Sequence, residues 1–577
     1  MMNGKGMRHV VREAWRIGRP YWFSEDKWRA LALLVVVAAL NLSVVGLNVR
    51  FNYWHNTFYN TIQNVDEAGF FHQIYIFFGL AMLFIAVLVS LEFFTNWLQI
   101  RWRRWLTDHF LNRWLSHHAY YRLQLSGETD NPDQRIAEDV RLYIESTFGL
   151  TFYLVRRVVT LFSFLFILWS LSGPVTIPLG PLGEAAIPAY LVWLSLVYAI
   201  VGTVVAVKIG RPLVPLNFNR QRFEADFRYS LVRLRENTES VAFYGGEARE
   251  RSIFGARFGS IYANFISIMW RNLKLGSFVN GFAQASVVFP FLVQAPRFFA
   301  KQINLGDLMQ TGEAFNQVLG SLSVIINAYS EIANWQSVVQ RLATFEYRVE
   351  DLEAEGERPN PIAIARNGDG LAVDDLGLTL PNGAPLITGL ELRAEPGGAL
   401  LVVGPTGIGK STILRAIAGL WPFGRGKVRL PTGRAFFVPQ KPYIPLGTLR
   451  QALAYPEDGT GIPDDKLKAI LVKVGLGAFT DQIDVTDLWS QRLSVGEQQR
   501  IAFARVFLAE PAVIFLDEAT SALDEATEAQ FYRMLREAPW HPTIVSVGHR
   551  STLRTVHDRT IDIAAIGARK AAAPAAG

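Results

Sequence analysis

The 577-residue sequence contains no cysteine, which excludes disulfide bonds, thiolate metal ligands and a cysteine nucleophile. Charged residues are also scarce: they make up 19% of the chain, where about a quarter is usual in soluble proteins. Half of the residues are hydrophobic and 12% are aromatic. A chain of this length needs at least two domains, and this composition indicates that one of them lies in lipid.

A nucleic-acid partner is not expected, although the formal net charge is +6. The basic residues cluster beside long apolar runs, where membrane topology alone requires them. They do not mark out a separate basic surface of the kind that binds nucleic acid. Membrane lipid is the partner that these clusters favour.

Six segments between residues 28 and 333 are candidates for transmembrane helices, each of which needs about 20 mainly apolar residues. The expected spans are 29–49, 74–97, 151–172, 186–207, 278–300 and 309–333. The last two contain several polar residues, so we expect them to line a wet cavity or to pack inside a bundle. Three acidic residues within or at the edges of spans are candidates for that cavity: Glu92, Glu313 and Glu331.

The distribution of Lys and Arg predicts the orientation of the spans. Basic residues are concentrated in the N-terminal segment and in the connections 98–150 and 208–277, which should therefore be cytoplasmic. The other connections, 50–73, 173–185 and 301–308, contain only two basic residues, Arg50 and Lys301, and should lie outside. Both termini should be cytoplasmic, and the two long cytoplasmic connections should be helical extensions of the spans.

A glycine-rich segment after about residue 400 has the pattern of a P-loop. It follows the strand-like run 399–403, precedes the helical run 413–417, and reads Gly404, Pro405, Thr406, Gly407, Ile408, Gly409, Lys410, Ser411, Thr412. Its glycines allow backbone N–H groups to surround phosphates at a helix N-terminus. Lys410 should neutralise the β- and γ-phosphates of ATP, and the Ser411 hydroxyl should bind Mg²⁺.

Two adjacent carboxylates, Asp517 and Glu518, follow an apolar run that is typical of a buried strand, 512–516. This position corresponds to the carboxyl edge of a parallel sheet, where ligands bind. Asp517 should help to hold Mg²⁺, and Glu518 should accept a proton from the attacking water. Taken alone, such a pair often marks only the start of a helix.

Further motifs between residues 404 and 549 resemble those of ATP-binding cassette proteins, in the same order. The signature sequence of that family is similar to Leu-Ser-Val-Gly-Glu at 493–497. The resemblance implies that a helix start there binds the γ-phosphate of ATP held by a second subunit, through Ser494, Val495, Gly496 and Glu497. One cassette alone therefore cannot complete either nucleotide site.

Three single residues extend this resemblance: Gln440, Asp524 and His549. It implies that Gln440 lies near Mg²⁺ and the attacking water, that Asp524 belongs to a loop coupling the two sites, and that His549 contacts the γ-phosphate. As a lone histidine, His549 would more often be structural. The intact Glu518 predicts a site that hydrolyses ATP.

Three positions depart from the family pattern. Val495 replaces a common glycine, Glu497 replaces a common glutamine, and Leu380 stands where an aromatic residue usually stacks on adenine. Phosphate contacts through the first two positions are therefore weakly supported, and the group that stacks on adenine is left open.

The fold expected from these features is an α-helical, six-span transmembrane domain, similar to that of type IV ABC exporters, followed by an α/β P-loop nucleotide-binding domain. The expected boundaries are a cytoplasmic segment at 1–27, the transmembrane domain at 28–350, a linker at 351–362, the cassette at 363–565 and a disordered tail at 566–577. Such a chain is half a transporter, and a homodimer is its simplest completion. A heterodimer with a separate half is the alternative.

Two stretches of the cytoplasmic connections, 131–140 and 235–247, resemble those of peroxisomal fatty-acyl transporters and of the bacterial SbmA/BacA-like family. The form of residues 493–500 is similar to that of the SbmA/BacA-like branch that carries its own cassette. This resemblance implies ATP-driven import across the bacterial inner membrane of antimicrobial-type peptides, or of other hydrophilic molecules such as cobalamin-like compounds.

Two alternatives are open. The protein could export lipid or drug-like substrates, which the expected fold alone favours. It could also be an ATP-dependent regulatory membrane protein without net transport, which the intact Glu518 and His549 disfavour.

Overall fold

The computed structural model describes residues 6–125, 131–178, 184–356 and 361–564. The chain divides into two compact units, and each is described here by itself. The first comprises Met1–Asn112 and Asn131–Tyr347, and the second comprises Arg113–Asp130 and Arg348–Gly577. The tail that we expected at 566–577 lies outside the described residues.

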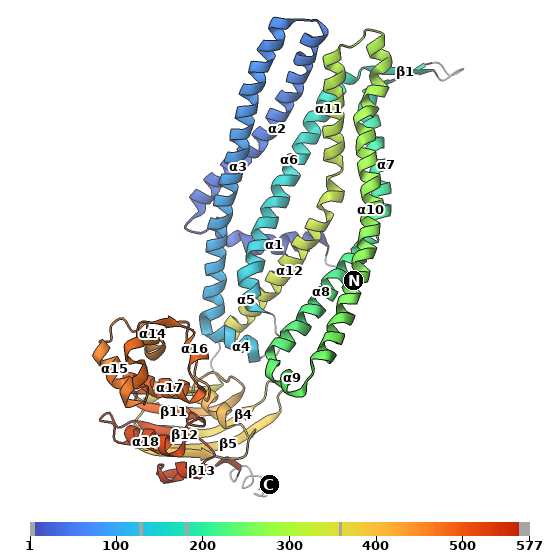
Figure 1. Ribbon diagram of the computed structural model, residues 1–577. Helices are drawn as coiled ribbons and strands as arrows, with labels where there is room; N and C mark the ends of the chain where they lie inside the picture. Colours follow the sequence, from blue (N-terminus) through green and yellow to red (C-terminus); the bar gives the residue numbers. More distant parts are fainter. Residues whose placement is uncertain (1–5, 126–130, 179–183, 357–360, 565–577) are drawn as a thin grey trace, which may run out of the picture. The chain divides into compact units, whose positions relative to one another are not determined.

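Long helices form the first unit (Figure 1). They are α1 (Met7–Trp22), α2 (Lys27–Gln63), α3 (Glu67–Leu115), α6 (Val140–Ser172), α7 (Tyr190–Gly210), α8 (Leu213–Glu236), α9 (Thr238–Tyr244), α10 (Glu247–Phe299), α11 (Leu305–Leu322) and α12 (Val324–Gly356). A single turn, α5 (Pro132–Gln134), and a π-helical turn at Arg135–Asp139 lead into α6. The two long connections at 98–150 and 208–277 are largely helical, as expected.

Five helical stretches of the described chain are long and apolar enough to cross a membrane: Lys27–Gln63, Glu67–Leu125, Pro132–Ser172, Tyr190–Glu236 and Glu247–Phe299. They correspond to the first five expected spans, with two corrections: the fifth ends at Phe299 rather than at residue 300, and the fourth starts later. The fourth span begins at Tyr190 rather than at residue 186, because β1 (Pro174–Pro178) and β2 (Glu184–Pro188) pair as an antiparallel hairpin before it. Proline restricts itself and the residue before it to conformations that favour extended chain over helix.

The sixth expected span is divided between two helices, α11 and α12, with Ser323 between them. Gln310 and Thr311 of α11 are buried, and the Gln294 side chain of α10 donates a hydrogen bond to the Thr311 hydroxyl at 3.0 Å. The polar residues of α10 and α11 thus pack partly inside the bundle, as the sequence predicted.

Polar side chains also join α2 to α11. The Asn52 amide exchanges two hydrogen bonds with Gln310, at 3.0 and 3.1 Å, and Asn56 donates to Asp307 at 2.8 Å and to Gln310 at 2.9 Å. Asn60 accepts a bond from a backbone N–H in the first turn of α11. We call Asn52, Asn56, Asn60, Asp307 and Gln310 the amide ladder, which fixes the register of the two helices.

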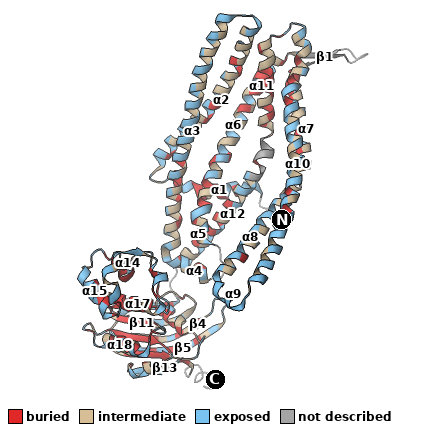
Figure 2. Cartoon of the chain, in the orientation of Figure 1, coloured by how far each residue is buried: buried red, intermediate tan, exposed pale blue. Residues whose placement is uncertain are grey.

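The second unit is built on two sheets. Its parallel five-stranded sheet has the order β13-β6-β12-β11-β8, with β13 at Arg559–Asp562, β6 at Ala399–Val403, β12 at Thr543–Val547, β11 at Val513–Asp517 and β8 at Ala435–Val438. A four-stranded sheet has the order β3-β7-β4-β5, formed by Ile362–Gly368, Gly424–Pro431, Leu371–Thr379 and Pro385–Ala394. The strands β11 and β12 are almost wholly buried (Figure 2).

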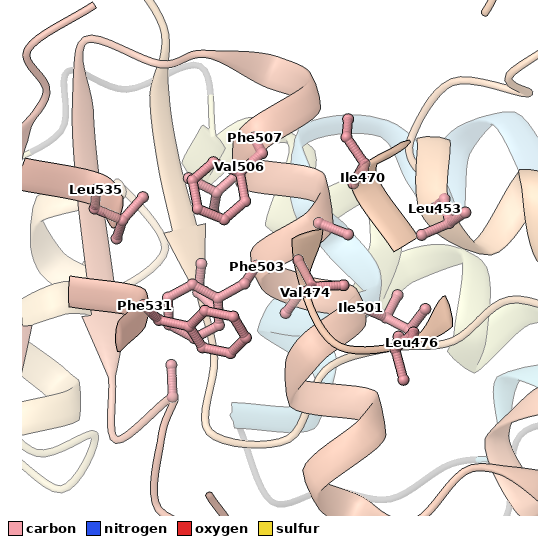
Figure 3. Packing of buried hydrophobic residues seen from close by; sticks show 14 of the residues in the cluster. Leu453, Ile470, Val474, Leu476, Ile501, Phe503, Val506, Phe507, Phe531 and Leu535 are labelled. Atoms are coloured by element: carbon pink, nitrogen blue, oxygen red, sulfur yellow. The ribbon is translucent and has the colours of Figure 1, made fainter. Parts of the chain in front are cut away.

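Helices pack around the parallel sheet. They are α13 (Lys410–Ile417), α14 (Leu449–Ala454), α15 (Asp464–Lys473), α16 (Trp489–Arg492), α17 (Val495–Ala509) and α18 (Glu525–Arg536). They pack either directly on its strands or, as for α14 and α15, against α17. Phe503 of α17 stacks on Phe531 of α18 with ring centroids 4.6 Å apart, and Leu535 and Val506 lie beside this pair (Figure 3). All four side chains are fully buried, so the position of α17 is determined by close packing.

The second unit also includes the last turns of α3, the helix α4 (Ala119–Leu125) and the end of α12. Arg113 forms an ion pair with Glu353 at 2.7 Å, which holds the end of α3 against α12. Leu125 packs against the core cluster beneath the four-stranded sheet. Since α12 is helical through Gly356, the first six residues of the expected linker are helical, and 357–360 lie outside the described residues.

Candidate functional site: a phosphate cradle at one edge of a parallel sheet

The chemically distinctive residues of the second unit follow four neighbouring parallel strands. The P-loop segment follows β6, Gln440 follows β8, Glu518 follows β11 and His549 follows β12. Parallel strands bring their carboxyl ends to the same edge, so residues more than 100 positions apart in sequence meet there. This edge is the site that the buried runs predicted.

The P-loop segment has the backbone conformation of a phosphate cradle. Gly407 has φ +83° and Gly409, the N-cap of α13, has φ +102°, both in the left-handed region that favours glycine. A Cβ at Gly407 would meet nothing within 4 Å, so there is free space next to the loop at this residue. The cradle therefore fits phosphate oxygens against the first N–H groups of α13.

Lys410 occupies the centre of this cradle. Its Nζ donates to the carbonyl oxygens of Gly404 at 2.8 Å and Pro405 at 3.1 Å, and lies 2.8 Å from His549 Nε2. Burial lowers the pKa of Lys410, and the nearby carboxylates of Glu518 and Asp517 offset part of that effect. The ammonium group is thus held where a phosphate would neutralise it.

Ser411 and Asp517 supply oxygen atoms at the same place. The Ser411 hydroxyl donates to Asp517 Oδ1 at 2.9 Å. Burial raises the pKa of Asp517, while the bond from Ser411 lowers it. A hydroxyl beside a partly buried carboxylate is a ligand set that Mg²⁺ accepts together with nucleotide phosphate oxygens, so these residues fit the metal that the sequence predicts there.

Glu518 lies between the two other residues expected to act in hydrolysis. Gln440 Nε2 donates to Glu518 Oε2 at 3.1 Å, and His549 Nε2 lies 3.3 Å from Glu518 Oε1. Its backbone is also unusual, with φ +50°, a conformation that costs free energy for a residue other than glycine. The strain fits a carboxylate whose position serves chemistry.

The signature residues lie at the start of α17. Ser494 is the N-cap of this helix, its N–H and its hydroxyl both donate to Glu497 Oε2, and its hydroxyl accepts from the Glu497 N–H at 3.3 Å. Glu497 therefore completes a capping box. Within the described residues, no hydrogen bond joins Ser494, Val495, Gly496 or Glu497 to the P-loop of the same chain.

Two other residues singled out in the sequence, Asp524 and Leu380, make hydrogen bonds to nearby residues of their own segments. Asp524 is the N-cap of α18 and accepts from the Thr527 N–H at 2.9 Å, a bond that lowers the pKa of Asp524. Leu380 is partly exposed beside a turn and donates its N–H to the Ala384 carbonyl at 2.8 Å.

Sequence reasoning missed two residues that connect these loops. Gln499 is buried and bridges the Gln440 carbonyl oxygen, the Ser521 hydroxyl and the Ala522 N–H. Arg550 donates to the carbonyl oxygens of Leu523 and Ser521 at 2.8 and 3.0 Å. The sequence offered one clue to these two residues, their closeness to predicted motifs. Gln499 follows the signature by two residues, and Arg550 directly follows His549.

Comparisons with known families match both units. Residues 19–299 match the family described as ABC transporter transmembrane region 2, and residues 387–521 match the family described as ABC transporter. A relative from Haemophilus influenzae, named an uncharacterized ABC transporter ATP-binding protein, is 36% identical over 95% of this chain and 92% of its own length.

Two further relatives and one solved structure extend the comparison. The inner membrane ABC transporter ATP-binding protein YddA of Escherichia coli is 33% identical over 97% of this chain and 99% of its own. The human lysosomal cobalamin transporter ABCD4 is 28% identical over 94% of this chain and 92% of its own. A bacterial Atm1-family ABC exporter with ATP bound shares the fold, with a TM-score of 0.64 at 18% identity over 96% of this chain and 99% of that one.

Proposed function

As a member of the ABC transporter family, this membrane-spanning chain binds ATP and couples its hydrolysis to transport, and we propose that two copies of it import hydrophilic cargo across a bacterial inner membrane. Antimicrobial-type peptides are the leading cargo, and cobalamin-like compounds are the second. Both termini are then cytoplasmic, as the distribution of Lys and Arg predicts.

One observation carries the proposed chemistry: Gln440, Glu518 and His549 converge beside Lys410 of the P-loop. Glu518 accepts the proton of the attacking water, and Gln440 and His549 hold that water and the carboxylate in place. The P-loop N–H groups, Lys410 and Ser411 bind the nucleotide phosphates, and Asp517 and Ser411 hold Mg²⁺, which neutralises phosphate charge when bound.

The homodimer is supported by the separation of the two phosphate-binding elements within one chain. Ser494 and the helix start at α17 make no hydrogen bond to the P-loop of the same chain among the described residues, although such a helix start is suited to an anion. A second copy, related by two-fold symmetry, supplies its own signature residues to the first P-loop. The exporter-like fold of the Atm1-family structure is compatible with this arrangement.

The direction and cargo rest on the resemblance to SbmA/BacA-like proteins and on relatives named for the inner membrane and for cobalamin transport. An exporter of lipid or drug-like molecules is the second candidate function, and the fold shared with an exporter favours it. The two differ in what happens to a cell exposed to a toxic peptide.

The test compares bacteria that lack the protein with bacteria that express it or its Glu518→Gln variant at equal levels. Import predicts that cells with the active protein are more sensitive to an internally acting antimicrobial peptide, and that cells with Glu518→Gln resemble cells without the protein. Greater resistance in cells with the active protein supports export instead. Equal peptide sensitivity in all three strains, together with equal ATP turnover by the purified protein and its Glu518→Gln variant, contradicts the proposal.

A further inference from the structure

A polar pocket of about 430 Å³ lies between α2, α6 and α11 of the first unit. Its polar lining consists of His55, Tyr59, Arg157, Glu313, Asn316 and Gln317. Of the three acidic residues that the sequence suggested for a cavity, only Glu313 lines this pocket, while Glu92 and Glu331 are exposed. The pocket is therefore a candidate cargo site built from residues within expected spans or next to them.

The two charged residues of this pocket, Glu313 and Arg157, differ in whether they have a hydrogen-bond partner. Glu313 at one end is paired with His55, since its Oε2 lies 2.5 Å from His55 Nδ1. Arg157 at the other end has none of opposite charge among the described residues, and its Nε is buried without a hydrogen bond. Its guanidinium carbon lies 5.3 Å from the centre of the Tyr153 ring, an interaction that leaves its N–H groups available.

The two ends also lie at different levels along α11. A Cβ at Gly320 would lie 3.8 Å from Arg157 Nη1, so the guanidinium is beside Gly320. Seven residues separate Gly320 from Glu313, which corresponds to about 10 Å along a helix. The pocket is thus long enough to hold the two ends of a short extended molecule.

The walls of the pocket are held rigidly. The amide ladder joins α2 to α11 directly beside His55 and Glu313, through Asn56 and Gln310. Asn316 is oriented by the Ser286 hydroxyl of α10, which donates to its Oδ1 at 3.1 Å. Such a preorganised site binds a ligand without first ordering its own side chains.

From these observations we propose that Arg157 binds an anionic group of the cargo, a carboxylate or a phosphate, within this pocket. An arginine in a membrane span is costly unless it meets an anion, a carbonyl group or water. Its planar fork of donors matches the oxygen atoms of carboxylate and phosphate groups. The inference rests on the proposed transport function and names the chemical class that the transporter selects.

The test measures binding without ATP, so that it does not depend on turnover. Purified protein in phosphatidylcholine nanodiscs is titrated with dansyl-labelled trialanine that ends in a free carboxylate, and with the same peptide ending in an amide. We expect the carboxylate form to bind about tenfold more tightly. The Arg157→Gln variant should bind both forms equally, and Arg157→Lys should keep part of the preference.

Arg156 offers a matched control, because it is the adjacent arginine of α6 but does not line the pocket. The Arg156→Gln variant should keep the full preference for the carboxylate. Equal binding of the two peptides by the unmodified protein, or a preference that persists in Arg157→Gln, overturns the proposal. Each variant is first checked for a single species in size-exclusion chromatography.

A lipid headgroup could supply the same anionic chemistry, and a further arm separates the two sources. The titration is repeated in nanodiscs that contain phosphatidylglycerol. If this lipid displaces the carboxylate peptide from the unmodified protein, the occupant is lipid and the cargo assignment fails. ATP-driven uptake that shows no charge preference also overturns the anion site, while the transport function itself stands.

Discussion

Gln499 Nε2 donates a hydrogen bond to the backbone carbonyl oxygen of Gln440, at 3.2 Å. The same amide nitrogen reaches the Ser521 hydroxyl at 3.2 Å, and the amide oxygen accepts from the Ala522 N–H at 3.0 Å. A single buried side chain on α17 therefore contacts the loop that carries Gln440 and the loop that leads to Asp524. Displacement of α17 should move both loops together.

We expect Gln499→Leu to lower the maximal rate of ATP hydrolysis about tenfold with little effect on the half-saturating ATP concentration. The change removes the bonds of Gln499 to the Gln440 carbonyl oxygen and the Ala522 N–H, each worth about 0.5–1.5 kcal/mol, and so uncouples the two loops. Gln498→Leu is the matched control, since Gln498 is also buried but bonds to the Ser490 and Leu493 carbonyl oxygens. Equal losses of rate in the two variants would contradict a role for Gln499 in coupling the loops.

The Glu497 carboxylate completes the capping box of α17 and lies at the helix start proposed to bind phosphate. We expect Glu497→Gln to keep the cap, because a glutamine oxygen also accepts from the Ser494 N–H. Removing the negative charge should lower the half-saturating ATP concentration about threefold, in line with the modest free energy of partly exposed charges. Glu510→Gln makes the same charge change at the other end of α17 and should leave that concentration unaltered.

Asp517 is expected to hold Mg²⁺ through its water shell, and groups in that position commonly affect metal affinity by 10- to 100-fold. Asp517→Asn should therefore raise the Mg²⁺ concentration for half-maximal ATP hydrolysis at least about tenfold. Chelation of the metal should stop hydrolysis in both proteins. Nucleotide binding measured without metal should be equal in the two, and a defect there would show that the substitution damaged the cradle itself.

Burial lowers the pKa of His557, whose Nε2 contacts the Ser546 hydroxyl at 2.8 Å and whose Nδ1 contacts the Leu553 carbonyl oxygen at 2.7 Å. The unfolded chain takes up a proton at the ordinary value of about 6.5, whereas folded His557 stays neutral until the pH is lower. The stability of the cassette should therefore be fully present above pH of about 6.5 and fall as the pH decreases through the folded pKa.

The measurement for His557 is the midpoint of thermal unfolding of the full-length protein between pH 8 and pH 5. His557→Gln should reduce the dependence of that midpoint on pH, whatever its effect at pH 8. His541→Gln is the control, because His541 is exposed and should leave the dependence intact. An unchanged pH dependence in His557→Gln would show that other groups cause the acid sensitivity.

Local patterns explain why much of the candidate nucleotide site could be predicted. The P-loop and the acidic pair each follow a short apolar run, and both runs form strands of one parallel sheet with their carboxyl ends at one edge. A motif that depends on neighbouring residues and on strand direction can be found without knowing the fold. The convergence of Gln440 and Glu518, 78 residues apart, follows from that same edge.

Features that depend on distant partners could not be predicted in this way. The buried Gln499 side chain bonds to Gln440, which lies 59 positions before it, and to Ser521, which lies 22 positions after it. Nothing in the local sequence pattern indicates these partners. The hairpin before Tyr190 was missed because its apolar residues continue the hydrophobic run of the fourth span. The pocket beside Arg157 likewise needs three helices to be placed before the missing partner can be noticed.

The amide ladder restricts how α2 and α11 can move during a transport cycle. Each rung needs a donor or acceptor from the opposite helix, so sliding one helix by a turn would take several amides away from their partners, two of which, Asn52 and Gln310, are buried. Whatever rearrangement carries cargo across the bilayer must then displace these two helices as a single rigid pair, with the bending confined to segments beyond the last rung.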